Sequence, residues 1–221
     1  TMFVLGKLLW SGKIIEADEK RGLELLRRAA DLGNADASMF LSFIDSDFCP
    51  PVEVFQQSTA MPEFMKLILT GLSYLNNENV KNPEFGFEYM KRAVQECEHV
   101  LESSHGKNAD ELLRKNNFFS LFPEALNELG TCYEEGIGVP KDEKEAVKCY
   151  ERGASFEEFS CLRSLALCYE KGIGVECNKE KAFDLFRRAS ASDPEDGDGV
   201  YRLARCYENG IGVEVNRAKA L

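Results

Sequence analysis

The sequence predicts an all-α protein, a right-handed superhelix of stacked helix–turn–helix repeats. The segment CYEEGIGV at residues 132–139 returns as CYEKGIGV at 168–175 and CYENGIGV at 206–213. The first glycines of these segments are 172 − 136 = 36 and then 210 − 172 = 38 residues apart. Apolar residues before each segment follow the spacing of one helix face. A period in this range is typical of stacked helix pairs, an α-solenoid.

The repeat at residues 125–157 is the most regular copy. Ala125, Leu126, Leu129, Gly130 and Tyr133 fall on one face of a first helix. Because Gly130 has no side chain, a second helix can approach closely there. The counterparts of Gly130 in the next two copies are Ala166 and Ala204.

A glycine turn and an N-cap separate the two helices of this repeat. Gly136 is expected to end the first helix in a left-handed conformation, and Gly138 belongs to the turn. Asp142 is then the expected N-cap of the second helix, and Glu145 would complete a capping box. The aligned caps are Asn178 and Asn216. The inward positions of the second helix are Ala146, Val147 and Tyr150.

The pattern A-x3-L-G-x2-Y-x2-G-x-G-V-x2-D-x3-A resembles the Sel-one-like repeat (SLR), a relative of the tetratricopeptide repeat. The copies that begin near Ala125 and Cys161 match it almost throughout, and the copy near Gly199 matches as far as Leu221. The resemblance implies a superhelix whose first helices line a concave face. It also implies a scaffold that binds a peptide or a partner domain on that face.

We expect one domain over residues 1–221, with about five to six repeats. The predicted repeats are 1–33, 37–60 (degenerate), 63–102, 125–157, 161–191 and 199–221 (truncated), with an insert at about 103–122. Aromatic residues of the insert either dock on neighbouring helices or bind a partner. Since both ends lie inside predicted helices, the chain is interpreted as a piece of a longer protein.

Charge and composition disfavour several classes of partner. The net charge is −11, which argues against a nucleic-acid backbone and an anionic membrane surface. The sequence has no signal peptide and no apolar run long enough to span a membrane. The repeated glycines follow a helix rather than a strand, so they do not indicate a dinucleotide or phosphate site, and no cofactor is expected.

The 8 cysteines are interpreted as structural. No C-x2-C pair indicates zinc. Equivalent cysteines in successive repeats would be too far apart for a disulfide and are expected to be buried fillers: Cys132, Cys168 and Cys206. Bacterial secreted relatives of this repeat class have a disulfide within each repeat, and the matching positions here hold Ala154 and Leu162 instead of cysteines. The absence of this disulfide favours a reducing, cytoplasmic location. Cys177 lies in a predicted loop and could be a free thiol.

Two features of the sequence bear on catalysis and metal binding. His99 and His105 lie near the insert without a clear acid or nucleophile, so the alternative function is a hydrolase-type enzyme with a site near residues 99–122. The segment from Asp196 to Gly199 hints at a calcium loop, but Tyr207 replaces the required glutamate. Residues 192–199 are therefore expected to be a solvated loop, and no metal is expected.

The resemblance places the partner-binding positions on the first helices. In the regular repeats these are Asn127, Thr131, Glu134, Glu135, Arg163, Leu167, Glu170, Lys171, Tyr201, Arg205, Glu208 and Asn209. Glutamate recurs after each tyrosine, as Glu134, Glu170 and Glu208. A row of these carboxylates could hold a basic segment of a partner. Alternatively, the glutamates could only pair with nearby Lys and Arg side chains. The same positions in two earlier repeats are mostly apolar: Phe3, Trp10, Ile68, Leu72 and Leu75. They could form an apolar contact surface for a partner, or they could be covered by the insert or by flanking sequence. We therefore expect a non-catalytic scaffold or adaptor, in an oligomeric state that the sequence leaves open.

Overall fold

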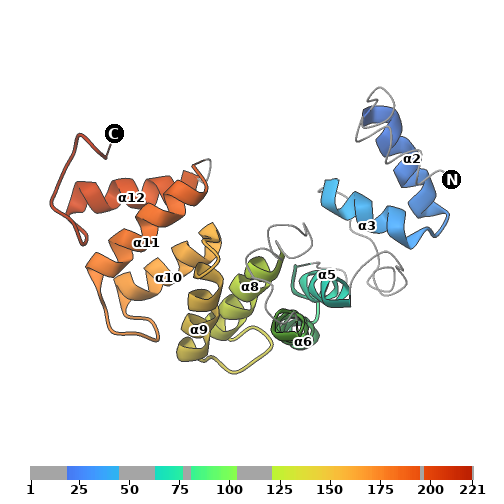
Figure 1. The fold of residues 1–221 in the computed structure, drawn as a ribbon, viewed down its shortest axis with the longest axis horizontal. Coiled ribbons are helices and arrows are strands. Elements are labelled where there is room, and N and C mark those ends of the chain that lie inside the picture. Colours follow the sequence, from blue (N-terminus) through green and yellow to red (C-terminus); the bar gives the residue numbers. More distant parts are fainter. Residues whose placement is uncertain (1–18, 45–62, 77–80, 104–120, 195–196, 221) are drawn as a thin grey trace. The chain divides into compact units, whose positions relative to one another are not determined.

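The computed structural model of the protein describes residues 19–44, 63–76, 81–103, 121–194 and 197–220, and helices are the only regular elements within these ranges. The chain divides into two compact units, Thr1–Lys81 (unit 1) and Asn82–Leu221 (unit 2). The helices of each unit are labelled in Figure 1.

Unit 1 contains three described helices, α2 (Glu19–Asp31), α3 (Ala35–Ile44) and α5 (Glu63–Asn76). Helix α2 packs on α3, and Leu26 and Leu41 are fully buried. Asn34 caps α3, because its Oδ1 accepts the Ala37 N–H at 2.8 Å. Residues 1–18 of the repeat predicted at 1–33 and residues 45–60 of the repeat predicted at 37–60 lie outside the described residues.

Unit 2 contains the regular repeats. Its described helices are α6 (Pro83–Ser103), α8 (Leu121–Glu135), α9 (Glu143–Ala154), α10 (Phe159–Lys171), α11 (Lys179–Ser192) and α12 (Gly197–Asn209). Helices adjacent in sequence pack against each other, α8 on α9 and α10 on α11. Each first helix also packs on the second helix of the preceding repeat, as α10 does on α9 and α12 on α11. The predicted fold class is confirmed.

The core of the central repeat forms where Gly130 of α8 meets Tyr150 of α9. A Cβ atom at Gly130 would overlap the Tyr150 ring, which is 1% exposed. The next repeat places Ala166 and Phe186 at these two positions, and both are buried. The predicted cysteine fillers are also buried: Cys132, Cys168 and Cys206. In both repeats the small residue of the first helix (Gly130 or Ala166) therefore leaves room for the aromatic ring of the second helix (Tyr150 or Phe186).

The glycine turn has a second role that was not predicted. Gly172 ends α10 in a left-handed conformation, with φ of 75°, and its N–H donates to the Cys168 carbonyl at 2.8 Å. Gly174, with φ of 66°, lies directly against the main chain of Glu143 at the start of α9, where a Cβ atom would overlap the carbonyl oxygen. The same contact joins Gly138 to Pro83 and Gly212 to Lys179. The second glycine of each turn therefore packs one repeat onto the previous one.

The predicted N-caps Asp142 and Asn178 are present, but the capping box is not. Asp142 Oδ1 accepts the main-chain N–H groups of Lys144 and Glu145, each at 3.1 Å. The Asp142 N–H donates to the Tyr133 carbonyl at 2.8 Å, and the Glu145 carboxylate accepts from Lys148. The prediction that Glu145 closes the box is wrong because Tyr133 already occupies the donor that the box would use.

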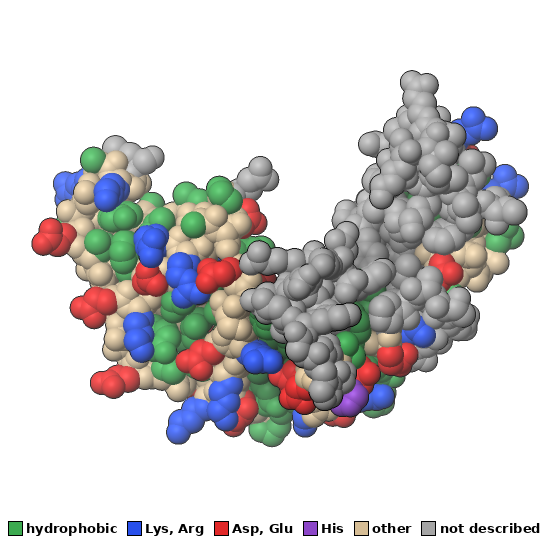
Figure 2. Space-filling view, in the orientation of Figure 1, with side chains coloured by type: hydrophobic (Ala, Val, Ile, Leu, Met, Phe, Trp, Pro, Cys, Tyr) green, Lys and Arg blue, Asp and Glu red, His purple; other side chains and the backbone are tan. Residues whose placement is uncertain are grey.

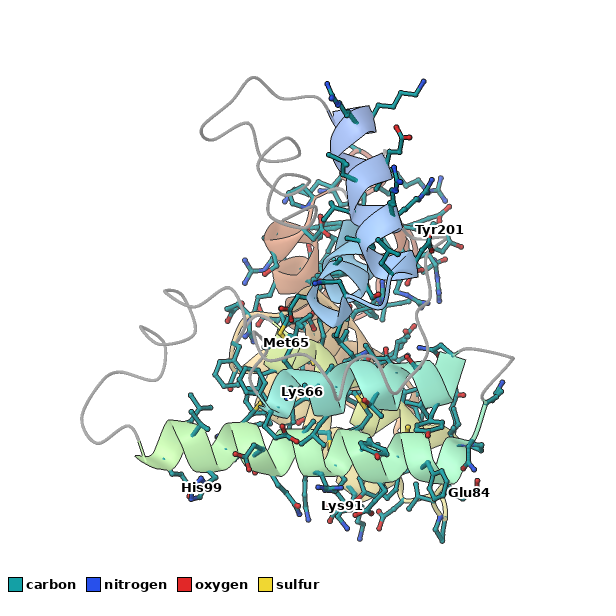
Figure 3. All side chains as sticks on the ribbon, turned by 90° about the vertical axis from the view of Figure 1, so that its right-hand side faces the viewer. Met65, Lys66, Glu84, Lys91, His99 and Tyr201 are labelled. Atoms are coloured by element: carbon teal, nitrogen blue, oxygen red, sulfur yellow. The ribbon has the colours of Figure 1, made fainter. Side chains whose placement is uncertain are left out.

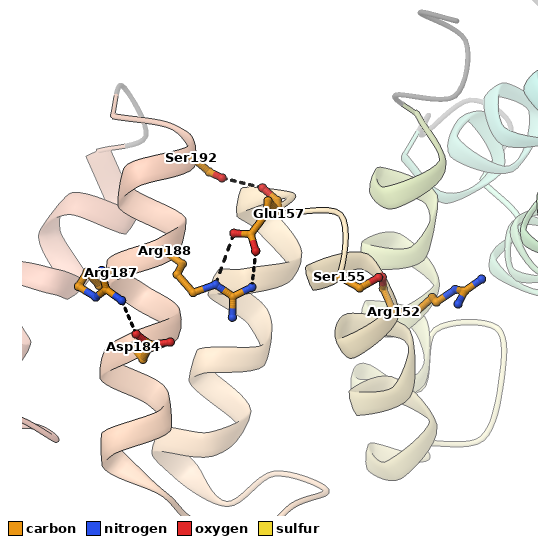
Figure 4. A network of polar contacts seen from close by, with 7 residues as sticks. All are labelled: Arg152, Ser155, Glu157, Asp184, Arg187, Arg188 and Ser192. Atoms are coloured by element: carbon orange, nitrogen blue, oxygen red, sulfur yellow. Dashed lines mark hydrogen bonds and ion pairs between the residues drawn. The ribbon is translucent and has the colours of Figure 1, made fainter. Parts of the chain in front are cut away.

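A polar contact joins the loop after α9 to α11 (Figure 4). Glu157 is the one non-glycine residue with positive φ, 57°, among those described. The Arg188 guanidinium donates to both Glu157 carboxylate oxygens, at 3.4 and 2.6 Å. Ser192 Oγ donates to the Glu157 carbonyl at 2.6 Å. These bonds hold a strained residue in place at the junction between two repeats.

Candidate partner-binding face

The predicted binding positions of unit 2 lie on three first helices, α8, α10 and α12, that are connected by side-chain contacts. Ser164 Oγ on α10 donates to Asn127 Oδ1 on α8 at 3.0 Å. Arg205 Nη2 on α12 lies 3.4 Å from Glu170 Oε1 on α10. We call this surface the first-helix face. Its predicted members are Asn127, Thr131, Glu134, Glu135, Arg163, Leu167, Glu170, Lys171, Tyr201, Arg205, Glu208 and Asn209.

The members of the first-helix face differ in exposure. The exposed members are Glu135, Lys171, Tyr201, Glu208 and Asn209, and the others are half-buried. Tyr201 (labelled in Figure 3) is a large apolar ring that is 60% exposed. Basic and acidic side chains are interspersed over the visible face of unit 2 in Figure 2. The first-helix face therefore combines charged groups with an exposed aromatic side chain.

The three recurring glutamates have different environments. Glu134 Oε2 accepts a hydrogen bond from the Tyr150 hydroxyl at 2.9 Å. Burial raises the pKa of the Tyr150 hydroxyl well above its ordinary value, so this hydroxyl remains a donor. The side chain of Glu170 is only 15% exposed and pairs with Arg205, whereas Glu208 is exposed. Two of the three carboxylates thus pair with other side chains of the same chain. This argues against the hypothesis that a row of glutamates binds a basic segment of a partner.

Arginine side chains cluster between α10 and α12. Arg163 Nε on α10 lies 3.6 Å from Asp198 Oδ2 on α12, and Arg202 Nε lies 2.8 Å from the same oxygen. Asp198 was expected in a solvated loop, but α12 begins at Gly197 and places it in the first helical turn. Arg202 was not among the predicted surface residues, although its position four residues after Asp198 is the spacing of a helical ion pair.

The apolar positions predicted in the earlier repeats fall partly within the described residues. In unit 1, Ile68 and Leu75 on α5 are buried, with exposures of 1% and 8%, and Leu72 is half-buried. Phe3 and Trp10 lie outside the described residues. Ile68 and Leu75 are therefore core residues rather than an exposed apolar surface.

The candidate catalytic histidines are not assembled into a site in the described part of the chain. His99 is exposed on α6 and projects from the same side of that helix as Lys91 (Figure 3). His105 lies outside the described residues. No group of three or more His, Cys, Asp or Glu side chains in the described ranges is placed to hold a metal ion.

The described cysteines, which exclude Cys49, are free thiols, and Cys177 is exposed as expected. Cys161 lies beneath Gly153, where a Cβ atom would overlap its sulfur.

Within the described ranges, none of the helices combines the length and the apolar character needed to cross a membrane.

Comparison with solved structures identifies similar folds. The chain is 21% identical to c5321, a protective antigen of uropathogenic Escherichia coli strains that displays an SLR fold, with a TM-score of 0.66. It is 20% identical to a Sel1 repeat protein from Oxalobacter formigenes, with a TM-score of 0.53. In both cases 99% of the chain is covered, and it spans 43% of the first protein and 68% of the second. At these identities the likeness shows the fold alone.

Sequence comparison identifies the family. A comparison with curated proteins gives no match. The Sel1 repeat family matches residues 1–34, 72–96, 123–155, 160–194 and 197–221, which together are more than half of the chain. The glycine turns, the N-caps and the small-residue contacts described above fall inside these segments. The chain therefore belongs to the Sel1 repeat family.

Proposed function

We propose that the chain is a non-catalytic interaction module that binds a peptide or a partner domain on the first-helix face of unit 2. Sel1 repeat proteins generally act as scaffolds for protein–protein interactions, which supports this proposal. No nucleic acid, cofactor or membrane insertion is part of it.

One observation carries the proposal: the residues that recur between repeats pack, and the residues that differ are accessible. The recurring cysteines and glycines form the core and the turns. At equivalent positions of the first-helix face, Asn127, Arg163 and Tyr201 differ in size and charge, and none of the three is fully buried. A surface that varies on a constant framework is typical of partner recognition by repeat proteins.

A peptide array tests this proposal directly. The 221-residue chain is labelled and applied to immobilised random dodecapeptides, and we expect a reproducible subset to bind. The face variant carries Tyr201→Ser and Lys171→Ser, and both residues are exposed. The control variant carries Phe85→Ser on α6 and Lys148→Ser on α9, which remove the same two types of side chain from second helices.

Binding should be lost in the face variant and kept in the control variant. Circular dichroism and the urea midpoint must show that both variants fold. If the two variants bind the same peptides as the original chain, the first-helix face is not the binding surface.

A further inference from the structure

We propose that Asn209 is a site of spontaneous deamidation in the folded chain, where the main-chain nitrogen of Gly210 displaces the side-chain amide nitrogen of Asn209. The sequence contains a single Asn-Gly pair, at residues 209 and 210. Glycine after asparagine favours this reaction because no Cβ atom hinders the approach of the nitrogen. This inference does not depend on the proposed function.

The third glycine turn differs from the first two at the residue that precedes its first glycine. Glu135 and Lys171 occupy this position in the earlier turns, and Asn209 occupies it in the third. Asn209 is the last residue of α12 and is exposed. Its Nδ2 donates to the Arg205 carbonyl at 3.1 Å, in an exposed hydrogen bond. Because exposed bonds at a helix end open locally at a small free-energy cost, the side chain can turn toward the next main-chain nitrogen.

The attacking nitrogen is held less firmly in this turn than its counterpart is in the turn after α10. There, the Cys168 carbonyl accepts two main-chain N–H groups, from Gly172 at 2.8 Å and from the next residue at 3.0 Å. Among the described residues of the third turn, the Cys206 carbonyl accepts only the second of these bonds, from Ile211 at 3.0 Å. The Gly210 N–H is therefore freer to lose its proton and to approach the side chain before it.

The C-terminal end of α12 is also less covered than the end of α10. Helix α11 packs on α10, and Leu165 and Ala166 of α10 are 5% and 0% exposed. The equivalent residues of α12, Leu203 and Ala204, are half-buried. Since fewer contacts must break, the end of α12 should open more readily than the end of α10.

The reaction balances with water as its only co-reactant. The Gly210 nitrogen gives up its proton and bonds to the Asn209 side-chain carbon, Cγ, while the Cγ–Nδ2 bond breaks and ammonia leaves with that proton. The product is a five-membered succinimide ring. Water then adds across one of the two ring C–N bonds, with its hydroxyl on the carbon and its hydrogen on the nitrogen. The opened ring is an aspartate or, when the main-chain bond is cut, an isoaspartate.

Both products change the end of α12. The hydrogen bond to the Arg205 carbonyl is lost with the amide, and a negative charge at a helix C-terminus is unfavourable. Isoaspartate also lengthens the main chain by one carbon just before Gly210. Gly212, two residues further on, lies directly against the main chain of Lys179 at the start of α11. The longer main chain should therefore disturb the contact that packs this turn on the previous repeat.

A matched pair of Asn-Gly sites in one chain tests the inference. The variant Lys171→Asn places the same Asn-Gly-Ile sequence at the exposed end of α10. The folded variant is incubated at pH 8, and peptide mass spectrometry with fragmentation measures deamidation at residues 171 and 209. We expect residue 209 to react about tenfold or more faster than residue 171, because the end of α10 opens less readily. In concentrated urea the two sites should react at equal rates, since the local sequence is the same.

Two controls accompany this comparison. Asn209→Gln should abolish the signal at residue 209, because the longer side chain would have to close a six-membered ring. The reaction of the original chain should slow as the pH is lowered from 8 to 6, because the attacking nitrogen must lose its proton.

Two results would overturn the inference. If residue 209 stays intact in the folded original chain but reacts in urea, the folded turn protects it. Equal rates at residues 171 and 209 in the folded variant would show that the reaction follows the sequence alone. Circular dichroism must show that Lys171→Asn folds, and if it does not, the original chain with and without urea still decides the first point.

Discussion

Gly174 lies directly against the main chain of Glu143, so closely that a Cβ atom at residue 174 would overlap the Glu143 carbonyl oxygen. The two residues belong to the glycine turn of one repeat and to the first turn of the second helix of the preceding repeat. The Gly174 N–H also lies 3.3 Å from Glu143 Oε2. This contact sets how closely consecutive repeats can stack.

The two glycines of one turn should therefore differ in their tolerance of alanine. A Cβ atom at Gly172 would make only ordinary van der Waals contacts, with its nearest neighbours at 3.6 Å, so Gly172→Ala should cost only the strain of a left-handed residue, about 1–2 kcal/mol. Gly174→Ala has the same strain and also forces two main chains apart, which should add about 1–3 kcal/mol. Urea denaturation of both variants measures the difference. Equal losses of stability would show that the inter-repeat contact at Gly174 is not tight.

The N-cap of α9 gives a second comparison between two neighbouring residues. Asp142→Ala should lower the free energy of unfolding by about 1 kcal/mol, because two main-chain N–H groups lose their acceptor. Glu145→Ala should change it by less than about 0.5 kcal/mol, because the residue forms only an exposed pair with Lys148. Thermal and urea denaturation supply both values. A loss at Glu145 as large as that at Asp142 would indicate a closed capping box in solution.

The sequence predicted the repeat framework well because each framework residue acts within its own repeat. Gly130, Tyr150 and Asp142 have local roles that follow from side-chain size and capping chemistry. The close contact at Gly174 could not be predicted in the same way, since it joins residues 174 − 143 = 31 positions apart whose separation depends on how repeats stack. The repetition of a second glycine in all three turns was the available signal.

The first-helix face was predicted less completely than the framework. The period of the repeats was enough to place Arg163, Arg205 and Tyr201 on first helices. It did not show that Glu134 would accept from Tyr150 or that Glu170 would pair with Arg205. These contacts depend on rotamers and on distances between helices, which a one-dimensional pattern does not contain.

The hydrogen bond between Tyr150 and Glu134 should make a measurable contribution to stability. Tyr150→Phe removes the hydroxyl and keeps the ring, and should lower the free energy of unfolding by about 0.5–1.5 kcal/mol. Phe186, at the equivalent position, shows that phenylalanine fits such a site, because it is 1% exposed. A double-mutant cycle with Glu134→Gln in urea isolates the pair. A coupling energy near zero would mean that Glu134 does not accept from Tyr150 in solution.

The cysteines should react at rates that follow their burial. Cys177 is exposed in the turn between α10 and α11, whereas Cys168 is fully buried and burial raises the pKa of its thiol to about 12. At pH 8 only roughly one in ten thousand of such thiols is a thiolate, the form that attacks iodoacetamide. Peptide mass spectrometry of the folded chain should therefore find Cys177 alkylated long before Cys168. In concentrated urea both residues should react, and Cys177→Ser should remove the fast signal without slowing Cys168. Rapid alkylation of Cys168 in the folded chain would instead show that α10 opens away from α11, and the packing described for this repeat would then be incorrect.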